Sequence, residues 1–144
     1  MKIAGLLLLS MLLLCTTVNA KEKTYGNFTS IAFVDNYDGD TITVNINGIP
    51  ALFGKNISVR VYGIDTPEMD GECEKEVELA HDAKKYVHEL LLNSYVDLLN
   101  VRRDKYFRIL ADVQTSEGSL AKLLLDNGYA IKYDGGTKTK NWCE

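Results

Sequence analysis

The sequence has 144 residues, of which 46% are hydrophobic and 25% charged, with 11 glycines and two prolines. This composition is typical of one folded domain, and it excludes a disordered or fibrous chain as well as two full domains. The 16 basic and 20 acidic side chains give a formal net charge of −4. The charge argues against a protein that coats nucleic acid or a membrane surface through its overall charge, but it permits a local basic site.

The N-terminal residues have the pattern of a secretion signal. Lys2 precedes a largely apolar run over residues 3–15, which is shorter than the roughly 20 residues that a membrane-spanning helix needs. Val18 and Ala20 suit a cleavage site directly after Ala20. A lipoprotein signal ending at Cys15 is the alternative, although a leucine precedes that cysteine where a small residue is expected. We therefore expect a signal peptide at residues 1–20 and export to the periplasm or the extracellular space.

Export determines how the cysteines are interpreted. Only Cys73 and Cys143 remain after such a cleavage, and an oxidising compartment favours a disulfide between them. The alternatives are two free thiols or a zinc site, for which neither cysteine has a neighbouring His or Cys ligand. We expect residues 21–144 to form a single domain without stable membrane association.

Alternating polar and apolar residues predict that the first half of this domain is β-structure. Three strands are expected, at residues 31–35, 41–47 and 57–61. In the third strand Arg60 lies on the face opposite the apolar residues. This arginine is therefore expected to point away from the core.

The second half of the domain combines helices and strands. Apolar residues at three- and four-residue steps predict a helix over residues 74–92. Two strands at 96–101 and 107–113 and a short helix at 119–126 follow, before a mostly irregular tail. This order is typical of a small barrel with helices at its edges. We expect an α+β OB-fold, a five-stranded Greek-key β-barrel with two to three helices.

Acidic residues concentrate in two loops at strand ends, where functional sites are commonly built. They are Asp35, Asp38 and Asp40 around the first turn, and Asp65 and Glu68 after the third strand. Carboxylates beside a threonine or a backbone oxygen suit Ca²⁺ or Mg²⁺ rather than a softer metal. The segment 38–40 alone is more typical of a simple turn with solvated carboxylates.

Two arginines add groups that can bind phosphate. Arg60 lies five residues before Asp65, and Arg108 begins a strand after the basic run 102–105. A guanidinium matches two phosphate oxygens at once, so arginines, carboxylates and a hard cation together are suited to phosphodiester cleavage. A surface salt bridge between Arg60 and Asp65 explains the spacing slightly better when it is considered alone.

Three motifs, in this order, resemble the staphylococcal nuclease (thermonuclease) family. They are Asp38-Gly39-Asp40-Thr41, residues 60–68 (RVYGIDTPE) and residues 104–108 (DKYFR). The resemblance covers roughly residues 30–133. It implies a Ca²⁺-dependent OB-fold nuclease that cuts DNA and RNA and leaves 3′-phosphate ends.

The same resemblance implies roles for individual residues. Asp40 and Asp65 would bind calcium through their side chains, and Thr66 would bind it through its carbonyl oxygen. Glu68 would be the general base or would orient the attacking water. Arg60 and Arg108 would bind the phosphate and stabilise the transition state.

Substrate contacts are implied in the same way. Lys105 and Tyr106 would lie near a terminal phosphate, and Tyr133 would stack on a base. Phe107 stands where the family commonly has a glycine, so the turn that presents Arg108 is expected to differ. A disulfide from Cys143 would fasten the tail beside the active-site loop.

The main alternative is an OB-fold without catalysis that binds single-stranded nucleic acid or a protein partner, because the fold serves both purposes. A structural module stabilised by Ca²⁺ is a further alternative, but it has no use for both arginines. The complete set of acids and arginines favours the enzyme, because a pure binder does not need it. We therefore expect a monomeric nuclease.

Overall fold

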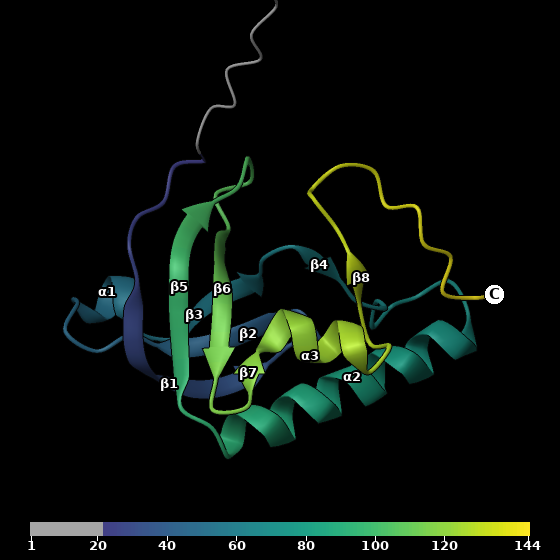
Figure 1. Cartoon of the computed structure of the whole chain (residues 1–144), viewed down its shortest axis with the longest axis horizontal. Coiled ribbons are helices and arrows are strands. Elements are labelled where there is room, and N and C mark those ends of the chain that lie inside the picture. Colours follow the sequence, from purple (N-terminus) through teal and green to yellow (C-terminus); the bar gives the residue numbers. More distant parts are fainter. Residues whose placement is uncertain (1–21) are drawn as a thin grey trace, which may run out of the picture.

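The computed structural model describes residues 22–144, so the expected signal peptide lies outside the described residues. A sheet with the strand order β3-β2-β1-β5-β6-β7 is closed by an additional parallel pairing of β3 with β6 (Figure 1). The strands of this sheet are β1 (Phe28–Asn36), β2 (Thr41–Asn45), β3 (Ile57–Val61), β5 (Val96–Arg103), β6 (Ile109–Thr115) and β7 (Gly118–Ser119). The closure makes a five-stranded barrel of β1, β2, β3, β5 and β6.

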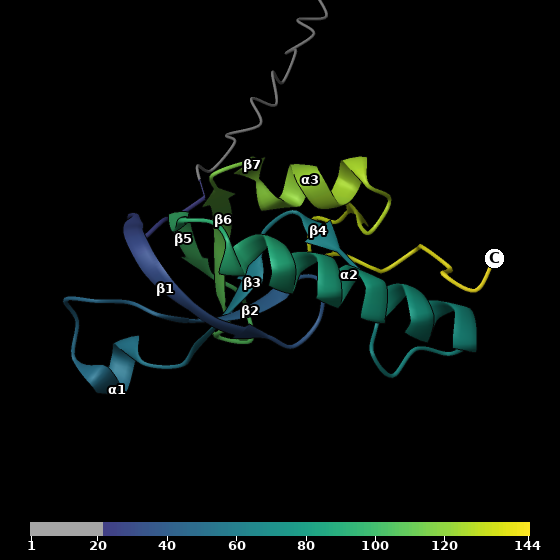
Figure 2. The same ribbon diagram turned by 90° about the horizontal axis from the view of Figure 1, so that it is seen from below.

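Three helices and a small second sheet surround the barrel. The helices are α1 (Ala51–Gly54), α2 (Glu74–Leu92) and α3 (Leu120–Asp126), and the second sheet pairs β4 (Ile64–Asp65) with β8 (Ile131–Lys132). Seen from below, α2 runs across the barrel and beyond it, with α3 on the opposite side of β3 and β4 (Figure 2). The expected α+β OB-fold is confirmed. Within residues 22–144, no helix combines the length and the apolar character that a membrane crossing requires.

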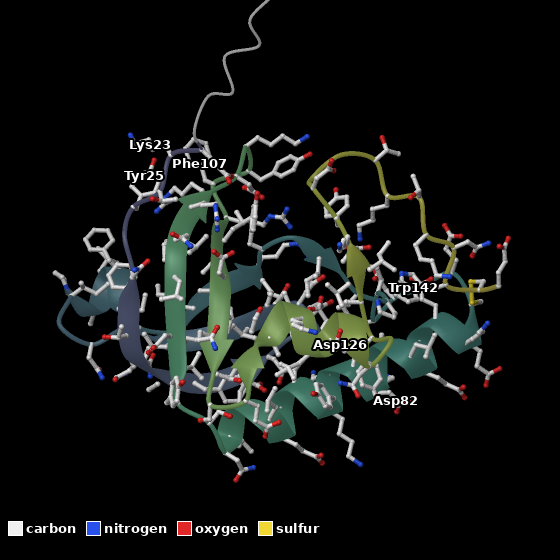
Figure 3. The ribbon with its side chains drawn as sticks, viewed as in Figure 1. Lys23, Tyr25, Asp82, Phe107, Asp126 and Trp142 are labelled. Atoms are coloured by element: carbon white, nitrogen blue, oxygen red, sulfur yellow. A yellow bond between two sulfur atoms is a disulfide. The ribbon has the colours of Figure 1, made fainter. Side chains whose placement is uncertain are left out.

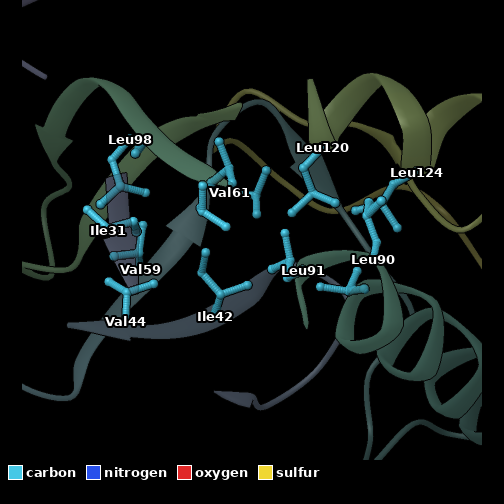
Figure 4. Packing of buried hydrophobic residues seen from close by; sticks show 14 of the residues in the cluster. Ile31, Ile42, Val44, Val59, Val61, Leu90, Leu91, Leu98, Leu120 and Leu124 are labelled. Atoms are coloured by element: carbon cyan, nitrogen blue, oxygen red, sulfur yellow. The ribbon is translucent and has the colours of Figure 1, made fainter. Parts of the chain in front are cut away.

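The core forms where the barrel meets the two longer helices (Figure 4). Alternation in β2 and β3 places Ile42, Val44 and Val59 fully inside. The apolar stripe of α2 adds Leu91, and α3 adds Leu124. Burying a side chain of this size contributes about 1.5–3 kcal/mol, so this packing is what holds the helices against the barrel.

The structure confirms the bounds of the long helix and shifts the start of one strand. The long helix has the expected bounds, whereas the strand expected at residues 107–113 begins at Ile109. Phe107 belongs to the preceding turn, where its φ of +63° is in the left-handed region. Its amide donates a hydrogen bond to the Asp104 carbonyl at 3.0 Å. The residue thus adopts a backbone conformation that favours glycine.

The C-terminal tail returns to the start of α2 (Figures 1 and 3). A disulfide joins Cys73 to Cys143, which are separated by 70 residues, so the pairing expected from the cysteine count is present. The neighbouring Trp142 is buried. At its other end the tail is held by β8 and by the Tyr133 amide, which donates to the Gly63 carbonyl at 3.0 Å. The tail is therefore attached on both sides of the intervening residues.

Candidate active site

The turn between β1 and β2 holds its carboxylates inside the protein. Asp38 Oδ1 accepts hydrogen bonds from the Asp40 and Thr41 amides at 3.0 and 2.7 Å, which fixes the turn. A Cβ on Gly39 would lie 2.9 Å from Thr66 Cγ2, so only glycine allows this close approach. Asp38 and Asp40 are 6% and 1% exposed. A turn with solvated carboxylates is therefore the wrong interpretation of this segment.

Strand pairing brings Arg60 to this turn. Thr41 of β2 is the register partner of Arg60 in β3. The guanidinium pairs with Asp40 Oδ1 through Nη1 and with Asp65 Oδ1 through Nη2 at 3.0 Å. Nη2 also donates to the Ile64 carbonyl at 3.3 Å. The salt bridge to Asp65 that the spacing suggested is present, but it is buried and it shares its arginine with a second carboxylate.

Thr66 completes this part of the site. Its amide donates a hydrogen bond to Asp40 Oδ2 at 3.1 Å, and the residue is buried. The sequence motifs from two separate loops therefore meet at the Asp40 carboxylate. We call Asp40, Arg60, Asp65 and Thr66 the barrel cluster.

Burial and charge oppose each other in the barrel cluster. Burial, together with the neighbouring Asp38 and Asp65, raises the pKa of Asp40 to about 7, although Arg60 and the Thr41 hydroxyl act to lower it. Burial lowers the pKa of Arg60, but Asp40 and Asp65 raise it by more. A raised carboxyl pKa beside a charged arginine indicates that the single guanidinium does not fully compensate the buried acids.

Glu68 lies beside the barrel cluster and is connected to it by a lysine of the tail. Lys138 Nζ lies 2.9 Å from Asp65 Oδ1 and also pairs with Glu68 Oε1. Burial lowers the pKa of Lys138, but the hydrogen bonds to Glu68 and Asp65 raise it by more. Lys138 was not among the residues predicted for the site, since only the return of the tail brings it here.

Arg108 is oriented differently from Arg60. Its Nε pairs with Asp104 Oδ2 at 2.7 Å, and about half of its side chain is exposed. In the described part of the chain its ion-pair partner is this aspartate and not a carboxylate of the barrel cluster. In the described residues, Arg108 therefore forms no ion pair with Asp40, Asp65 or Glu68, the acids with which it was expected to act.

A pocket of about 320 Å³ nevertheless connects the two arginines. Its lining includes Arg60, Lys105, Tyr106, Arg108 and Tyr133. The Lys105 ammonium and the Arg108 guanidinium lie 5.1 and 5.5 Å from the Tyr106 ring centre. The expected substrate-binding residues thus face one cavity that combines positive charge with aromatic surface.

The donor atoms of the barrel cluster fit a hard cation. Asp40 and Asp65 present buried carboxylates, and Thr66 is adjacent, so the available ligands are oxygens. Among residues 22–144, one other group of three potential metal ligands lies close together: Cys73, Glu76 and Cys143, whose ligand atoms are within 4.8 Å of one another. Its two sulfurs are joined in a disulfide. This trio is therefore not a metal site, whereas the barrel cluster has oxygen ligands of the kind that a hard cation prefers.

Fold and site together define an OB-fold protein whose cluster of acids and arginine adjoins a basic, aromatic pocket. A family model described as staphylococcal nuclease homologue matches residues 58–142. The chain belongs to this family.

Relatives with curated names are endonucleases. A probable endonuclease of Schizosaccharomyces pombe is 30% identical over 91 residues, which are 58% of this chain and 40% of the relative. An uncharacterized endonuclease of Haemophilus influenzae is 30% identical over 130 residues, 89% of this chain and 64% of the relative. A probable endonuclease of Podospora anserina is 30% identical over 92 residues, 60% of this chain and 33% of the relative. The chain thus spans less than two thirds of the length of each of these relatives.

Proposed function

We propose that this protein is an exported, monomeric, Ca²⁺-dependent nuclease that hydrolyses single-stranded DNA and RNA to 3′-phosphate products. The observation that carries the proposal is the Arg60 guanidinium, which is held between two buried carboxylates and lines the basic, aromatic pocket. Membership of the family and the names of the relatives support it. Residues 1–20 are the proposed signal peptide, and residues 21–144 are the proposed nuclease domain.

In the proposed mechanism the carboxylates of Asp40 and Asp65 and the carbonyl of Thr66 would hold a calcium ion, which would supply positive charge beside the phosphate. Glu68 accepts a proton from the attacking water or orients that water, and general-base catalysis of this kind contributes about 10²–10⁴-fold.

The arginines and the pocket act on the substrate. Arg60 exchanges its carboxylate partners Asp40 and Asp65 for two phosphate oxygens, to which it donates two parallel N–H groups. These hydrogen bonds stabilise the transition state most, because negative charge develops on the phosphate there. Arg108 exchanges Asp104 for the phosphate. Lys105 and Tyr106 lie near a terminal phosphate, and Tyr133 stacks on a base.

The experiment compares hydrolysis of single-stranded DNA and RNA with Ca²⁺, with Mg²⁺ and with chelator. We expect strong cutting with Ca²⁺, none with chelator, and 3′-phosphate ends on the products. Glu68→Gln and Arg60→Lys should each lower the maximal rate about a hundredfold or more, with DNA still bound. Binding without cutting in every condition would instead establish a catalytically silent OB-fold, and undiminished cutting in chelator would exclude the calcium site.

A further inference from the structure

Glu76 is a buried acid in the first turn of α2, and the proposed mechanism does not use it. It is 7% exposed, and within residues 22–144 no Lys, Arg or His forms an ion pair with it. Its carboxylate instead accepts hydrogen bonds from backbone amides. The Glu68 amide donates to Oε1 at 3.3 Å, and the Glu72 amide donates to Oε2 at 3.0 Å.

The loop between these two amides wraps around the carboxylate. A Cβ on Gly71 would lie 2.5 Å from Glu76 Cγ and 2.6 Å from Cδ, so the backbone at this glycine packs directly on the acid. The Gly71 amide also donates to the Glu68 carbonyl at 3.1 Å, which closes the loop on itself. Both ends of the loop are therefore fastened to one side chain.

The carboxylate itself is fixed by the helix. Glu76 is the third residue of α2, and its own amide donates to the Sγ of the N-cap Cys73 at 3.4 Å. An ionised acceptor at a helix N-terminus is favoured by the helix dipole, and its bonds to N–H groups are roughly twice as strong as those of a neutral acceptor. These two effects offset the cost of burying an acid without a basic partner.

Glu68 needs such an anchor. About 43% of its side chain is exposed, and in the described chain its carboxylate bonds to a single side chain, Lys138 of the tail. Because core packing does not hold this side chain, its location beside Asp65 depends on where the backbone of residue 68 is placed.

We propose that Glu76 is a positioning residue for Glu68: its carboxylate holds the amide of residue 68 and thereby places that side chain beside the barrel cluster. The inference rests on the proposed function for its catalytic consequence. Its structural part, the anchored amide, is independent of that function.

The first test is hydrogen–deuterium exchange of the full protein without nucleic acid. Glu76→Gln replaces one acceptor oxygen by an amide group that faces an N–H donor. We expect faster exchange at the amides of residues 68 and 72 and unchanged exchange in the barrel strands. Glu78→Gln is the matched control, since it removes the same charge from an exposed position of the same helix. Unchanged exchange at both loop amides in Glu76→Gln would overturn the proposal.

The second test is a double-mutant cycle with Glu68→Gln, measured as maximal rate and KM on single-stranded DNA. We expect Glu76→Gln to lower the maximal rate at least tenfold with little change in KM, and to cause no further loss in the Glu68→Gln background. Losses that multiply, or a parental rate for Glu76→Gln, would refute a role through Glu68.

The two tests separate the possible failures. If Glu68→Gln alone keeps the parental rate, the proposed function of Glu68 fails, while the exchange result still decides whether Glu76 anchors the loop. If Glu76→Gln does not fold, Glu76→Asp is measured in the same way, because it keeps the charge but is too short to reach both amides.

Discussion

Removing the charge of Lys138 should strengthen calcium binding. Its ammonium group lies 2.9 Å from Asp65 Oδ1 and pairs with Glu68 as well. A cation that binds to Asp65 must displace this ammonium or bind beside it against its repulsion. Lys138→Met removes the charge and keeps the apolar stem, whereas Lys140→Met is a control in the same tail whose ammonium lies 5.5 Å from the Trp142 ring centre.

The size of this change in calcium affinity follows from how exposed the ion pairs of Lys138 are. The side chains of Lys138 and Glu68 are 44% and 43% exposed, so solvent screens their attraction, and exposed pairs are worth about 0.2–1 kcal/mol. The contact with the buried Asp65 adds a similar amount. A total of about 1 kcal/mol corresponds to about a fivefold tighter dissociation constant for Ca²⁺.

Isothermal titration with Ca²⁺, in the absence of nucleic acid, measures this change directly. We expect Lys138→Met to bind Ca²⁺ about fivefold more tightly than the parent, and Lys140→Met to match the parent. The difference should shrink in 0.5 M salt, because salt screens partly exposed charges. Unchanged or weaker binding by Lys138→Met would refute the idea that the tail ammonium competes with the cation.

Two further predictions concern stability. Because burial raises the pKa of Asp40 from 3.8 to about 7, the folded state binds this proton more tightly than the unfolded state does, so this group's contribution to the stability of the cation-free protein is lost as pH rises from about 4 to 7. Urea unfolding at several pH values should show that loss in the parent but not in Asp40→Asn. If the free energy of unfolding changed with pH equally in both proteins, the prediction would be contradicted. At position 107, where φ is +63°, Phe107→Gly should be more stable than Phe107→Ala by about 1 kcal/mol, because a left-handed backbone costs a non-glycine residue about 1–2 kcal/mol. Thermal unfolding that ranks alanine above glycine would show that the turn relaxes.

The sequence predicted the helices and strands in which apolar residues recur at regular spacing. The stripe of α2 and the alternation in β2 and β3 indicated both the elements and their buried faces. The two-residue strands β4 and β8 are too short to show a period, and their pairing depends on the path of the tail. Helix α1 has four residues and exposed Leu52 and Phe53, so no apolar stripe marked it.

The candidate site likewise has a part that the sequence predicted and a part that it did not. The motifs predicted the barrel cluster, because β2 and β3 pair in a register that sequence alternation already favours. Lys138 could not be predicted, since it lies in an irregular segment 70 residues from Glu68. Glu76 had only a partial local signal, because a capping box has Ser or Thr three positions before the glutamate. Here the capping residue is Cys73, and the glutamate reaches past it to the loop.

The part of the site that the barrel holds and the part that α2 and the tail hold should respond differently to substitutions. Asp40 and Arg60 are held by strand pairing and by burial within the barrel. Glu68 and Lys138 are held from outside it, by the start of α2 and by a tail whose end is joined to Cys73. A substitution that removes the disulfide or destabilises the first turn of α2 should therefore first displace Glu68, the proposed general base, and Lys138. The contacts among Asp40, Arg60 and Thr66 keep their geometry in that case, since none of them involves the tail, whereas Asp65 loses the ammonium of Lys138.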